Sequence, residues 1–166
     1  MAENEIPEFR TGIGFDSHPL VEGRKLILGG VDVLYHLGLS GHSDGDAVSH
    51  AVIDALLGAA GLGDKGVHFP STDPQLKDIS SLALLVHVAS MLGQAGWRIS
   101  NVDATILAQN PRLSPFISTM IQRTSEALSV PPERVSIKVT TTDYMGFVGR
   151  AEGIAAIAVA SLMTSR

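Results

Sequence analysis

The chain has 166 residues, 45% of them hydrophobic, which is enough to bury one sizeable core. Its formal net charge is -5 and its lysines and arginines form no cluster. This pattern argues against nucleic acid or an anionic membrane surface as the main partner and favours a small molecule. Cysteine is absent, which excludes a disulfide framework, a thiolate nucleophile and a metal site built on cysteine.

No linker or break in composition divides the chain, so we expect a single domain over residues 1–166, with a flexible N-terminus over residues 1–9. The segment 1–10 carries three glutamates and no apolar run, unlike a secretory signal or a transit peptide. The longest apolar stretches, 82–92 and 154–163, are too short to span a bilayer. We therefore expect a cytoplasmic protein with no membrane partner.

Strands and helices are predicted to alternate loosely: a strand over 9–16, a hairpin of strands 26–28 and 31–33, helices over 45–60 and 80–95, a strand over 99–109, a helix from 114 to about 130, a strand over 135–141, and a segment 154–163 that is a covered strand or a helix. The expected helix N-caps are, in order, Ser43 or Asp44, Asp78 or Ser80, and Ser114. This order predicts an α+β domain with one mixed β-sheet, helices packed on one side and a short β-hairpin.

The most informative feature is a set of metal-ligand side chains in two short segments. In an extended segment Asp16 and His18 point to the same side, while Ser17 points to the other. His50 follows Asp46 by one helical turn and precedes Asp54 by one turn, so a polar stripe crosses an otherwise apolar helix.

Two histidines and one carboxylate form a common three-ligand zinc set, with a fourth position left for water or substrate. Asp46 is the one candidate for a closing fourth ligand. The competing interpretation is that His50 is a core histidine whose ring is satisfied by a backbone carbonyl.

Three loops are richer in glycine and polar residues than a connection requires: 63–66, 69–74 and 143–150. The run Thr140–Asp143 offers hydroxyls, backbone N–H groups and a carboxylate at a strand end, which suits phosphate oxygens and a hard cation such as Mg²⁺. A β-branched strand end followed by an Asp turn explains the same residues without a ligand. Arg150 can bind an anion or pair with Glu152.

Six motifs in a fixed order resemble the 2-C-methyl-D-erythritol 2,4-cyclodiphosphate synthase family of the non-mevalonate isoprenoid pathway. They are GFDSH at 14–18, GHSDGDAVSHAVIDALLGAAGLGD at 41–64, FPSTDP at 69–74, AQNPRL at 108–113, TTTD at 140–143 and GFVGRAEG at 146–153. The resemblance implies a homotrimer with active sites between subunits. It also implies a reaction in which the 2-phosphate of a cytidine-diphospho-methylerythritol attacks the β-phosphate and releases CMP.

The resemblance further implies the roles of individual residues. Asp16, His18 and His50 would hold one Zn²⁺ per subunit, and Asp143 would hold Mg²⁺ or Mn²⁺ with the bound substrate. His42 and Thr141 would stabilise the transition state. The substrate-binding residues implied are Asp16, Ser17, His18, His42, Ser43, Asp64, Lys65, Gly66, Phe69, Pro70, Ser71, Thr72, Asp73, Ala108, Pro111, Leu113, Thr140, Thr141, Thr142, Asp143, Phe147 and Arg150.

In the family the region of Arg150 and Glu152 lies near the trimer axis, where an isoprenoid diphosphate can sit. Two positions depart from the family pattern. Ser71 replaces the usual Asp, which removes a carboxylate acceptor for a substrate hydroxyl. Asp143 replaces the Glu of many members, which shortens the arm toward the second cation.

Two other functions fit the same residues. A zinc-dependent phosphoester hydrolase uses the same three ligands with a bound water, which becomes hydroxide near neutral pH, and it releases inorganic phosphate rather than CMP. A non-catalytic trimeric protein that binds isoprenoid diphosphates would keep the metal for structure alone, with closed four-ligand coordination.

Overall fold

The structure is a computed structural model that describes residues 8–165. Five strands form one mixed sheet in the order β4-β1-β7-β5-β6, in which only β5 and β6 run parallel. The strands are β1 (Phe9–Val21), β4 (Gly38–Leu39), β5 (Trp97–Leu107), β6 (Val135–Thr140) and β7 (Gly153–Thr164). The predicted mixed sheet is confirmed. The expectation of a flexible stretch over residues 1–9 falls mostly outside the described residues.

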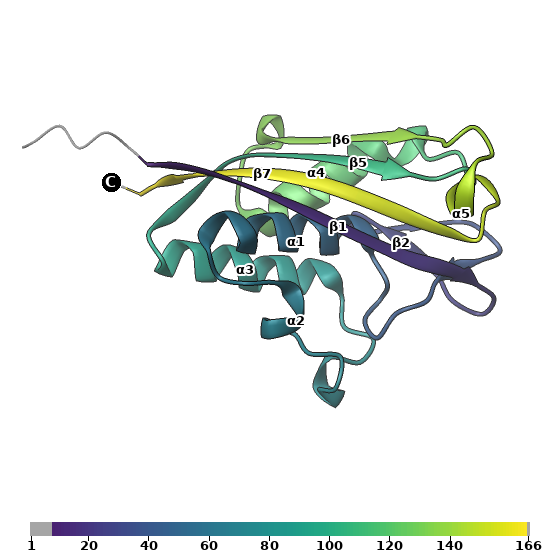
Figure 1. Cartoon of the computed structure of the whole chain (residues 1–166), viewed down its shortest axis with the longest axis horizontal. Helices are drawn as coiled ribbons and strands as arrows, with labels where there is room; N and C mark the ends of the chain where they lie inside the picture. The colour runs from purple at the N-terminus through teal and green to yellow at the C-terminus, as the bar shows by residue number, and fades with distance from the viewer. Residues whose placement is uncertain (1–7, 166) are drawn as a thin grey trace, which may run out of the picture.

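The long helices lie on one face of this sheet, as predicted (Figure 1). α1 packs on β1 and β7, and α3 packs between α1 and α4. The helices are α1 (Ala47–Ala60), α2 (Lys65–His68), α3 (Ser81–Gln94), α4 (Ile117–Leu128) and α5 (Gly146–Gly149). None of those in residues 8–165 has the length and apolar character needed to cross a membrane.

The predicted glycine hairpin is confirmed. β2 (Leu26–Leu28) pairs antiparallel with β3 (Val31–Val33) across Gly29 and Gly30. Both glycines have positive φ, 53° and 72°, as a two-residue primed turn requires. The turn matters for the site, because its two backbone N–H groups point at the start of α1.

Two glycines on β1 set how closely α1 approaches the sheet. A Cβ at Gly12 would overlap the carbonyl oxygen of Ala55, and one at Gly14 would overlap that of Ala51. The two glycines are two residues apart on the strand, and the helix residues that they face, Ala55 and Ala51, are four apart. Two strand residues advance about 6.6 Å and four helix residues about 6 Å, so the same spacing continues along the contact between β1 and α1. The next inward residue on β1, Asp16, therefore meets the α1 turn that carries His50.

Several predicted boundaries were wrong in instructive ways. β1 continues to Val21, so Asp16 and His18 lie inside it rather than at its end. The α1 N-cap is Asp46, not Ser43 or Asp44, because the Asp46 carboxylate accepts the free N–H groups of the first turn. Ser114 is not an N-cap, since it begins a 3₁₀ turn over Ser114–Phe116 that leads into α4.

The ambiguous segment 154–163 is a strand, β7, and it pairs with both β1 and β5 in the middle of the sheet. The short helices α2 and α5 and the two-residue strand β4 were not predicted. They lie in segments that have no hydrophobic period long enough to detect.

Candidate active site

Three potential metal ligands meet where β1 crosses α1. Asp16 and His18 leave the same face of β1, as predicted, and His50 approaches from α1. The Asp16 Oδ2 atom lies 2.6 Å from His18 Nε2 and 2.9 Å from His50 Nδ1, and the two ring nitrogens are 3.1 Å apart. The predicted triad is thus assembled within a single chain, by residues up to 34 positions apart in sequence.

The three donor atoms suit one small cation. They all lie within 4.8 Å of one another, and they combine two imidazole nitrogens with a carboxylate oxygen, the set that zinc accepts. A tetrahedral zinc ion with bonds of about 2.0 to 2.1 Å holds its ligand atoms about 3.3 Å apart. Small outward shifts of the observed triangle reach that spacing, so the donor set fits the metal.

The charge state of the cluster also favours a cation. Burial opposes ionisation of Asp16, but hydrogen bonds from His18 and His50 and the charge of Lys65 outweigh it. They hold the pKa of the Asp16 carboxyl well below its usual range. The ionised carboxylate suits a cation. Lys65 Nζ lies 3.5 Å from Asp16 Oδ1, so a positive group also stands beside the cluster, where it suits an anion in the adjoining space.

The polar stripe on α1 divides into three separate roles. His50 is 3% exposed and belongs to the cluster. Asp46 is completely buried and accepts five hydrogen bonds, from Gly29 N, Gly30 N, Val48 N, Ser49 N and Ser49 Oγ. It is therefore a structural cap, and the oxygens of this one candidate for a closing ligand already have hydrogen-bond partners.

The third member of the stripe, Asp54, places a neighbouring segment. Its carboxylate accepts the backbone N–H of Lys65 at 2.6 Å, which fixes the start of α2 and brings the Lys65 side chain toward Asp16. Asp64 caps the same short helix by accepting the N–H of Val67.

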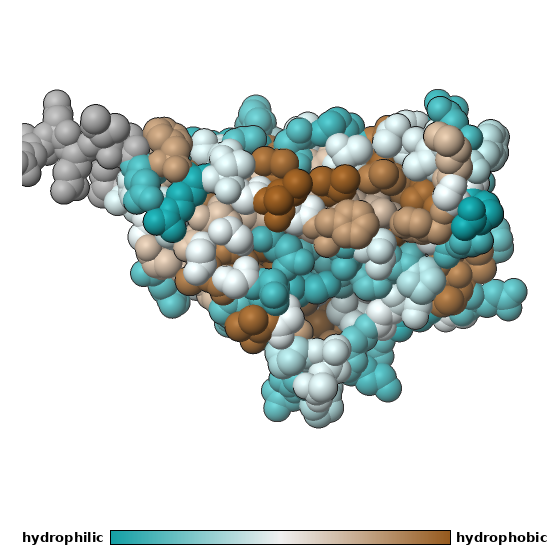
Figure 2. Space-filling model, viewed as in Figure 1, coloured by the Kyte–Doolittle hydropathy of each residue, from teal (hydrophilic) through white to brown (hydrophobic). Residues whose placement is uncertain are grey.

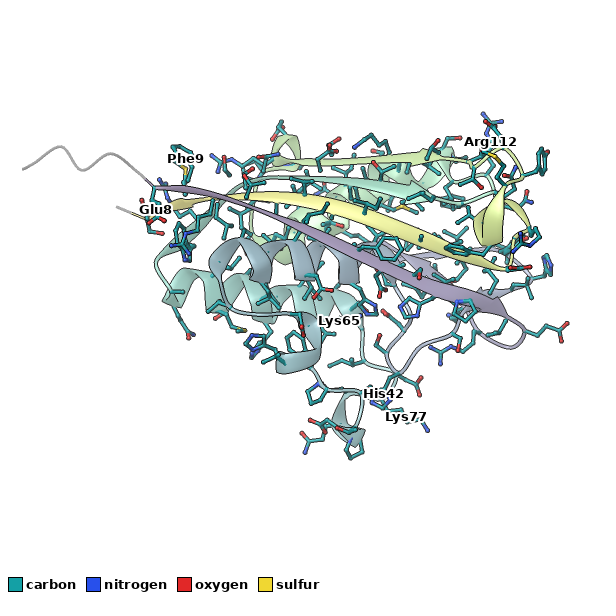
Figure 3. The ribbon with its side chains drawn as sticks, in the orientation of Figure 1. Glu8, Phe9, His42, Lys65, Lys77 and Arg112 are labelled. Carbon is teal, nitrogen blue, oxygen red and sulfur yellow. The ribbon has the colours of Figure 1, made fainter. Side chains whose placement is uncertain are left out.

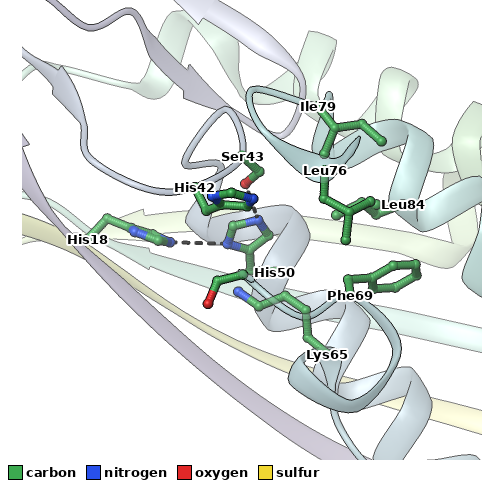
Figure 4. Close-up of a pocket in the computed structure, with 10 residues that line it drawn as sticks. His18, His42, Ser43, His50, Lys65, Phe69, Leu76, Ile79 and Leu84 are labelled. Atoms are coloured by element: carbon green, nitrogen blue, oxygen red, sulfur yellow. Dashed lines mark hydrogen bonds between the residues drawn. The ribbon is translucent and has the colours of Figure 1, made fainter. Parts of the chain in front are cut away.

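A pocket opens directly beside the cluster (Figure 4). One wall is polar and includes His42 and Ser43, whose hydroxyl lies 3.0 Å from His50 Nε2. The opposite wall is apolar. The lining residues are His18, His42, Ser43, His50, Lys65, Phe69, Ser71, Leu76, Ile79 and Leu84.

The loop that carries Phe69 and Ser71 is tethered to the polar wall. His42 Nε2 contacts the Asp73 carbonyl oxygen at 2.9 Å. The Asp73 carboxylate itself accepts the N–H of Gln75 and caps the turn Pro74–Leu76. Of the predicted residues on this loop, Phe69 and Ser71 line the pocket beside the cluster, and the Asp73 carboxylate already has a partner.

The remaining predicted residues lie elsewhere on the chain. A second pocket is lined by residues 108–114 together with Val139, Thr140 and Thr141. Figure 3 places Arg112, which lines it, at the opposite edge of the molecule from His42. One chain thus does not bring Thr141 and Asp143 to the metal cluster. Asp143 stands in a tight loop with φ of 50°, its carboxylate 3.4 Å from the Thr141 hydroxyl.

Phe147 and Arg150 form a third group. Phe147 lines a depression together with Ser17, His18, Pro19, Glu152 and Gly153. Arg150 donates two hydrogen bonds to the Glu152 carboxylate, at 2.7 and 3.0 Å. Of the two predicted roles for Arg150, pairing with Glu152 is therefore the one that the single chain shows.

A model of the YgbB family matches residues 9–163. The chain belongs to the YgbB family. The 2-C-methyl-D-erythritol 2,4-cyclodiphosphate synthase of Agathobacter rectalis is 55% identical over 153 residues, which cover 92% of this chain and 86% of that relative. The resemblance inferred from the six motifs is confirmed.

Solved structures of the YgbB fold agree with the chain's architecture. The bifunctional IspDF from Campylobacter jejuni matches with a TM-score of 0.92 and 39% identity over 96% of this chain, which spans 43% of that protein. The CDP complex of IspF from Plasmodium falciparum matches with a TM-score of 0.83 and 29% identity, over 95% of this chain and 97% of that one.

Two groups at this YgbB-family site were missed from the sequence. Ser81, the first residue of α3, lies with its Oγ 2.9 Å from His50 Nε2, and Asp44 accepts from the Ser81 hydroxyl. The one specific role predicted for Asp44 was that of a helix cap. The contact joins residues 31 positions apart, which no local spacing rule detects. The assembled site combines three potential ligands for a cation, several hydrogen-bond donors and a pocket. This combination is suited to binding and activating phosphate groups.

Proposed function

We propose that this chain converts 4-diphosphocytidyl-2-C-methyl-D-erythritol 2-phosphate into 2-C-methyl-D-erythritol 2,4-cyclodiphosphate and CMP. The reaction is that of a phosphorus-oxygen lyase in non-mevalonate isoprenoid biosynthesis. The observation that carries the proposal is the cluster of Asp16, His18 and His50 at a pocket that also holds His42 and Ser43. The names of the curated relatives support the same activity.

The reaction needs no outside nucleophile. An oxygen of the 2-phosphate attacks the phosphorus that is bonded to the 4-oxygen of methylerythritol. The new P–O bond closes the ring while the P–O bond to CMP breaks, and CMP leaves with that electron pair. Because no water is added, the protein has two tasks: to fold the substrate back on itself and to neutralise phosphate charge.

We assign the 2-phosphate to the polar wall beside the cluster. The Ser43 hydroxyl and the His42 ring supply hydrogen-bond donors there, and Lys65 supplies positive charge. A zinc ion held by the triad, one per subunit, would act as a Lewis acid that withdraws charge from the phosphate. The pocket's apolar wall, with Phe69 and Leu76, accepts the methylerythritol carbons.

We assign cytosine to the second pocket, where Ala108, Pro111 and Leu113 offer backbone groups and an apolar floor. Thr140–Thr142 continue from this pocket and supply hydroxyls for the diphosphate, with the Thr141 hydroxyl acting with His42 on the transition state. Asp143 would hold the second cation, Mg²⁺ or Mn²⁺, which would neutralise charge on the diphosphate.

We propose that a homotrimer completes the site. Two observations support it. The two pockets that one substrate must fill lie at different edges of one chain, so a neighbouring subunit has to bring the second to the first (Figure 3). The sheet face opposite the helices is also apolar, with Ile13 72% exposed and Phe15 56% exposed, beside Ile157. Figure 2 shows apolar side chains gathered along the sheet strands.

Glu152, which is paired with Arg150, lines the depression beside His18, and we propose that an isoprenoid diphosphate binds near this pair on the trimer axis. We place the enzyme in the cytoplasm, since a substrate built from a cytidine nucleotide is available there.

The proposed function is tested by product analysis. The purified chain is given the substrate with Zn²⁺ and Mg²⁺, and products are followed by phosphorus NMR and nucleotide chromatography. Equal amounts of CMP and cyclic diphosphate are expected. Inorganic phosphate would identify a hydrolase instead, and unchanged substrate would identify a binding protein.

Substitution of Ser71 by aspartate is expected to lower KM up to about tenfold while leaving kcat unchanged, because one charge-assisted hydrogen bond to a substrate hydroxyl contributes about 1.5 kcal/mol. Ser71 borders the pocket but lies outside the metal cluster. The measurement is steady-state kinetics, with the exposed Gln75→Asp as a control that adds the same charge outside the pocket. A change confined to kcat would contradict the assignment of Ser71 to substrate binding.

A further inference from the structure

The ring of His50 is held from both sides. Its Nδ1 atom faces the metal cluster, at 2.9 Å from Asp16 Oδ2. Its Nε2 atom faces away from the cluster, at 3.0 Å from the Ser43 hydroxyl and 2.9 Å from the Ser81 hydroxyl. Ser81 is fully buried at the start of α3, so this contact is made out of reach of bulk water.

The Ser81 hydroxyl has a second partner, the carboxylate of Asp44. The Ser81 Oγ atom lies 2.5 Å from Asp44 Oδ1, and the Ser81 backbone N–H donates to Asp44 Oδ2 at 2.9 Å. Ser80, the residue in the N-cap position of α3, makes no capping bond with its side chain. Asp44 takes over that role from a distant loop, and so ties the start of α3 to the loop that precedes α1.

Counting protons settles the direction of these bonds. A carboxylate oxygen only accepts, so the single hydroxyl proton of Ser81 is donated to Asp44. The Ser81 oxygen then has only lone pairs left for His50, and the Nε2 atom must be the donor. Nδ1 itself lies against the Asp16 carboxylate. If a metal takes the place of that hydrogen bond, a neutral imidazole that keeps its proton on Nε2 presents a bare Nδ1, which is the form that binds a metal.

We infer that Asp44 and Ser81 form a relay that positions His50 as a metal ligand, by accepting the Nε2–H proton and so presenting an unprotonated Nδ1 to the cluster. The inference rests on the metal-dependent function proposed above and assigns positioning roles to two residues outside the ligand set. Ser43 shares the Nε2 contact but has no carboxylate partner among the described residues, so its hydroxyl remains able to turn toward a phosphate.

Ser81→Ala isolates the relay, because it removes the hydroxyl and keeps the backbone bond that caps α3. Ser49→Ala is a matched control. Ser49 is also fully buried, and its hydroxyl also donates to an aspartate, Asp46, at 2.7 Å, but it has no contact with the ring of His50 among the described side-chain bonds. The two variants lose similar bonds and differ in their connection to the ligand.

The zinc dissociation constant is measured without substrate, by competition with a chromophoric chelator. Ser81→Ala is expected to bind zinc about tenfold more weakly than the wild type, the lower end of the range for such supporting bonds. Ser49→Ala is expected to stay within about twofold of the wild type, and Ser81→Thr, which keeps a hydroxyl, to recover most of the affinity. In proton NMR of the zinc-bound protein, the His50 Nε2–H is expected to exchange with water faster in Ser81→Ala than in the wild type, because its buried acceptor is gone.

Equal zinc affinity in Ser81→Ala and the wild type would overturn the relay and leave the proposed function standing. An equal loss in Ser81→Ala and Ser49→Ala would also overturn it, because it would indicate general loosening. A wild type that binds zinc and makes no cyclic diphosphate would remove the proposed reaction, while the ranking of the variants would still support the relay.

Discussion

His50→Ala is expected to lose its zinc and to lower kcat by at least about 10³-fold, a loss of ~4 kcal/mol of transition-state stabilisation. The substitution removes one of only three donors, and Asp46, one turn away, cannot replace it because its oxygens already accept five hydrogen bonds. Zinc content by atomic emission and turnover by CMP release measure the two effects.

The protein should stay folded in this variant, because the caps of α1 at Asp46 and Gly61 are untouched. Circular dichroism and size-exclusion chromatography check this point. His36→Ala is the control: His36 is exposed, contacts Tyr35 with ring centroids 4.4 Å apart and ring planes tilted by 60°, and is not part of the cluster. Full activity in His50→Ala would contradict the assignment of His50 to a metal site.

Asp46→Ala is expected to lower the free energy of unfolding by at least about 3 kcal/mol. Its carboxylate joins the glycine hairpin to the first turn of α1, and removal leaves four backbone N–H groups without their acceptor in a buried place. Each buried donor left unpaired costs about 1 to 3 kcal/mol. Urea denaturation monitored by circular dichroism gives the change in unfolding free energy.

A second capping aspartate provides the comparison for stability. Asp64 caps α2 from an exposed position with one bond, to Val67 N, so Asp64→Ala should cost only about 1 kcal/mol. Asp46→Asn should fall between the two, since an amide oxygen replaces one of the accepting oxygens. Equal losses in Asp46→Ala and Asp64→Ala would show that the link to the hairpin contributes nothing.

The meeting of Asp16, His18 and His50 was predictable because each part of it follows a local rule. Asp16 and His18 share a face through strand alternation, and His50 interrupts an apolar helix where a buried imidazole needs a partner. The meeting of the two segments depends on Gly12 and Gly14, whose missing side chains let α1 approach β1 in step. That dependence is visible only once the strand and helix are known to pack together.

The helix caps were less predictable, for a physical reason. Ser43, Asp44 and Asp46 are all good capping residues, and local sequence does not rank them. The hairpin glycines, 16 and 17 residues away, donate to Asp46 and so select it. Asp44 is then free to serve α3 and Ser81 instead.

The C-terminal segment was ambiguous because its two faces are equally apolar. Alanines such as Ala156 and Ala158 suit a helix by propensity, but β7 lies between β1 and β5 with its inner face against α1. A central, covered strand is apolar on both faces, as this segment is. The position of a strand in a sheet depends on tertiary packing, so the sequence pattern alone could not decide between a strand and a helix.

Isotope labelling tests the intramolecular phosphoryl transfer most directly. The reaction is run in water enriched in ¹⁸O with Zn²⁺ and Mg²⁺, and the products are analysed by mass spectrometry. Because the attacking oxygen belongs to the substrate's 2-phosphate, neither CMP nor the cyclic diphosphate should gain ¹⁸O. Incorporation of ¹⁸O into any phosphate group of the products would show that water attacks, and would contradict the account.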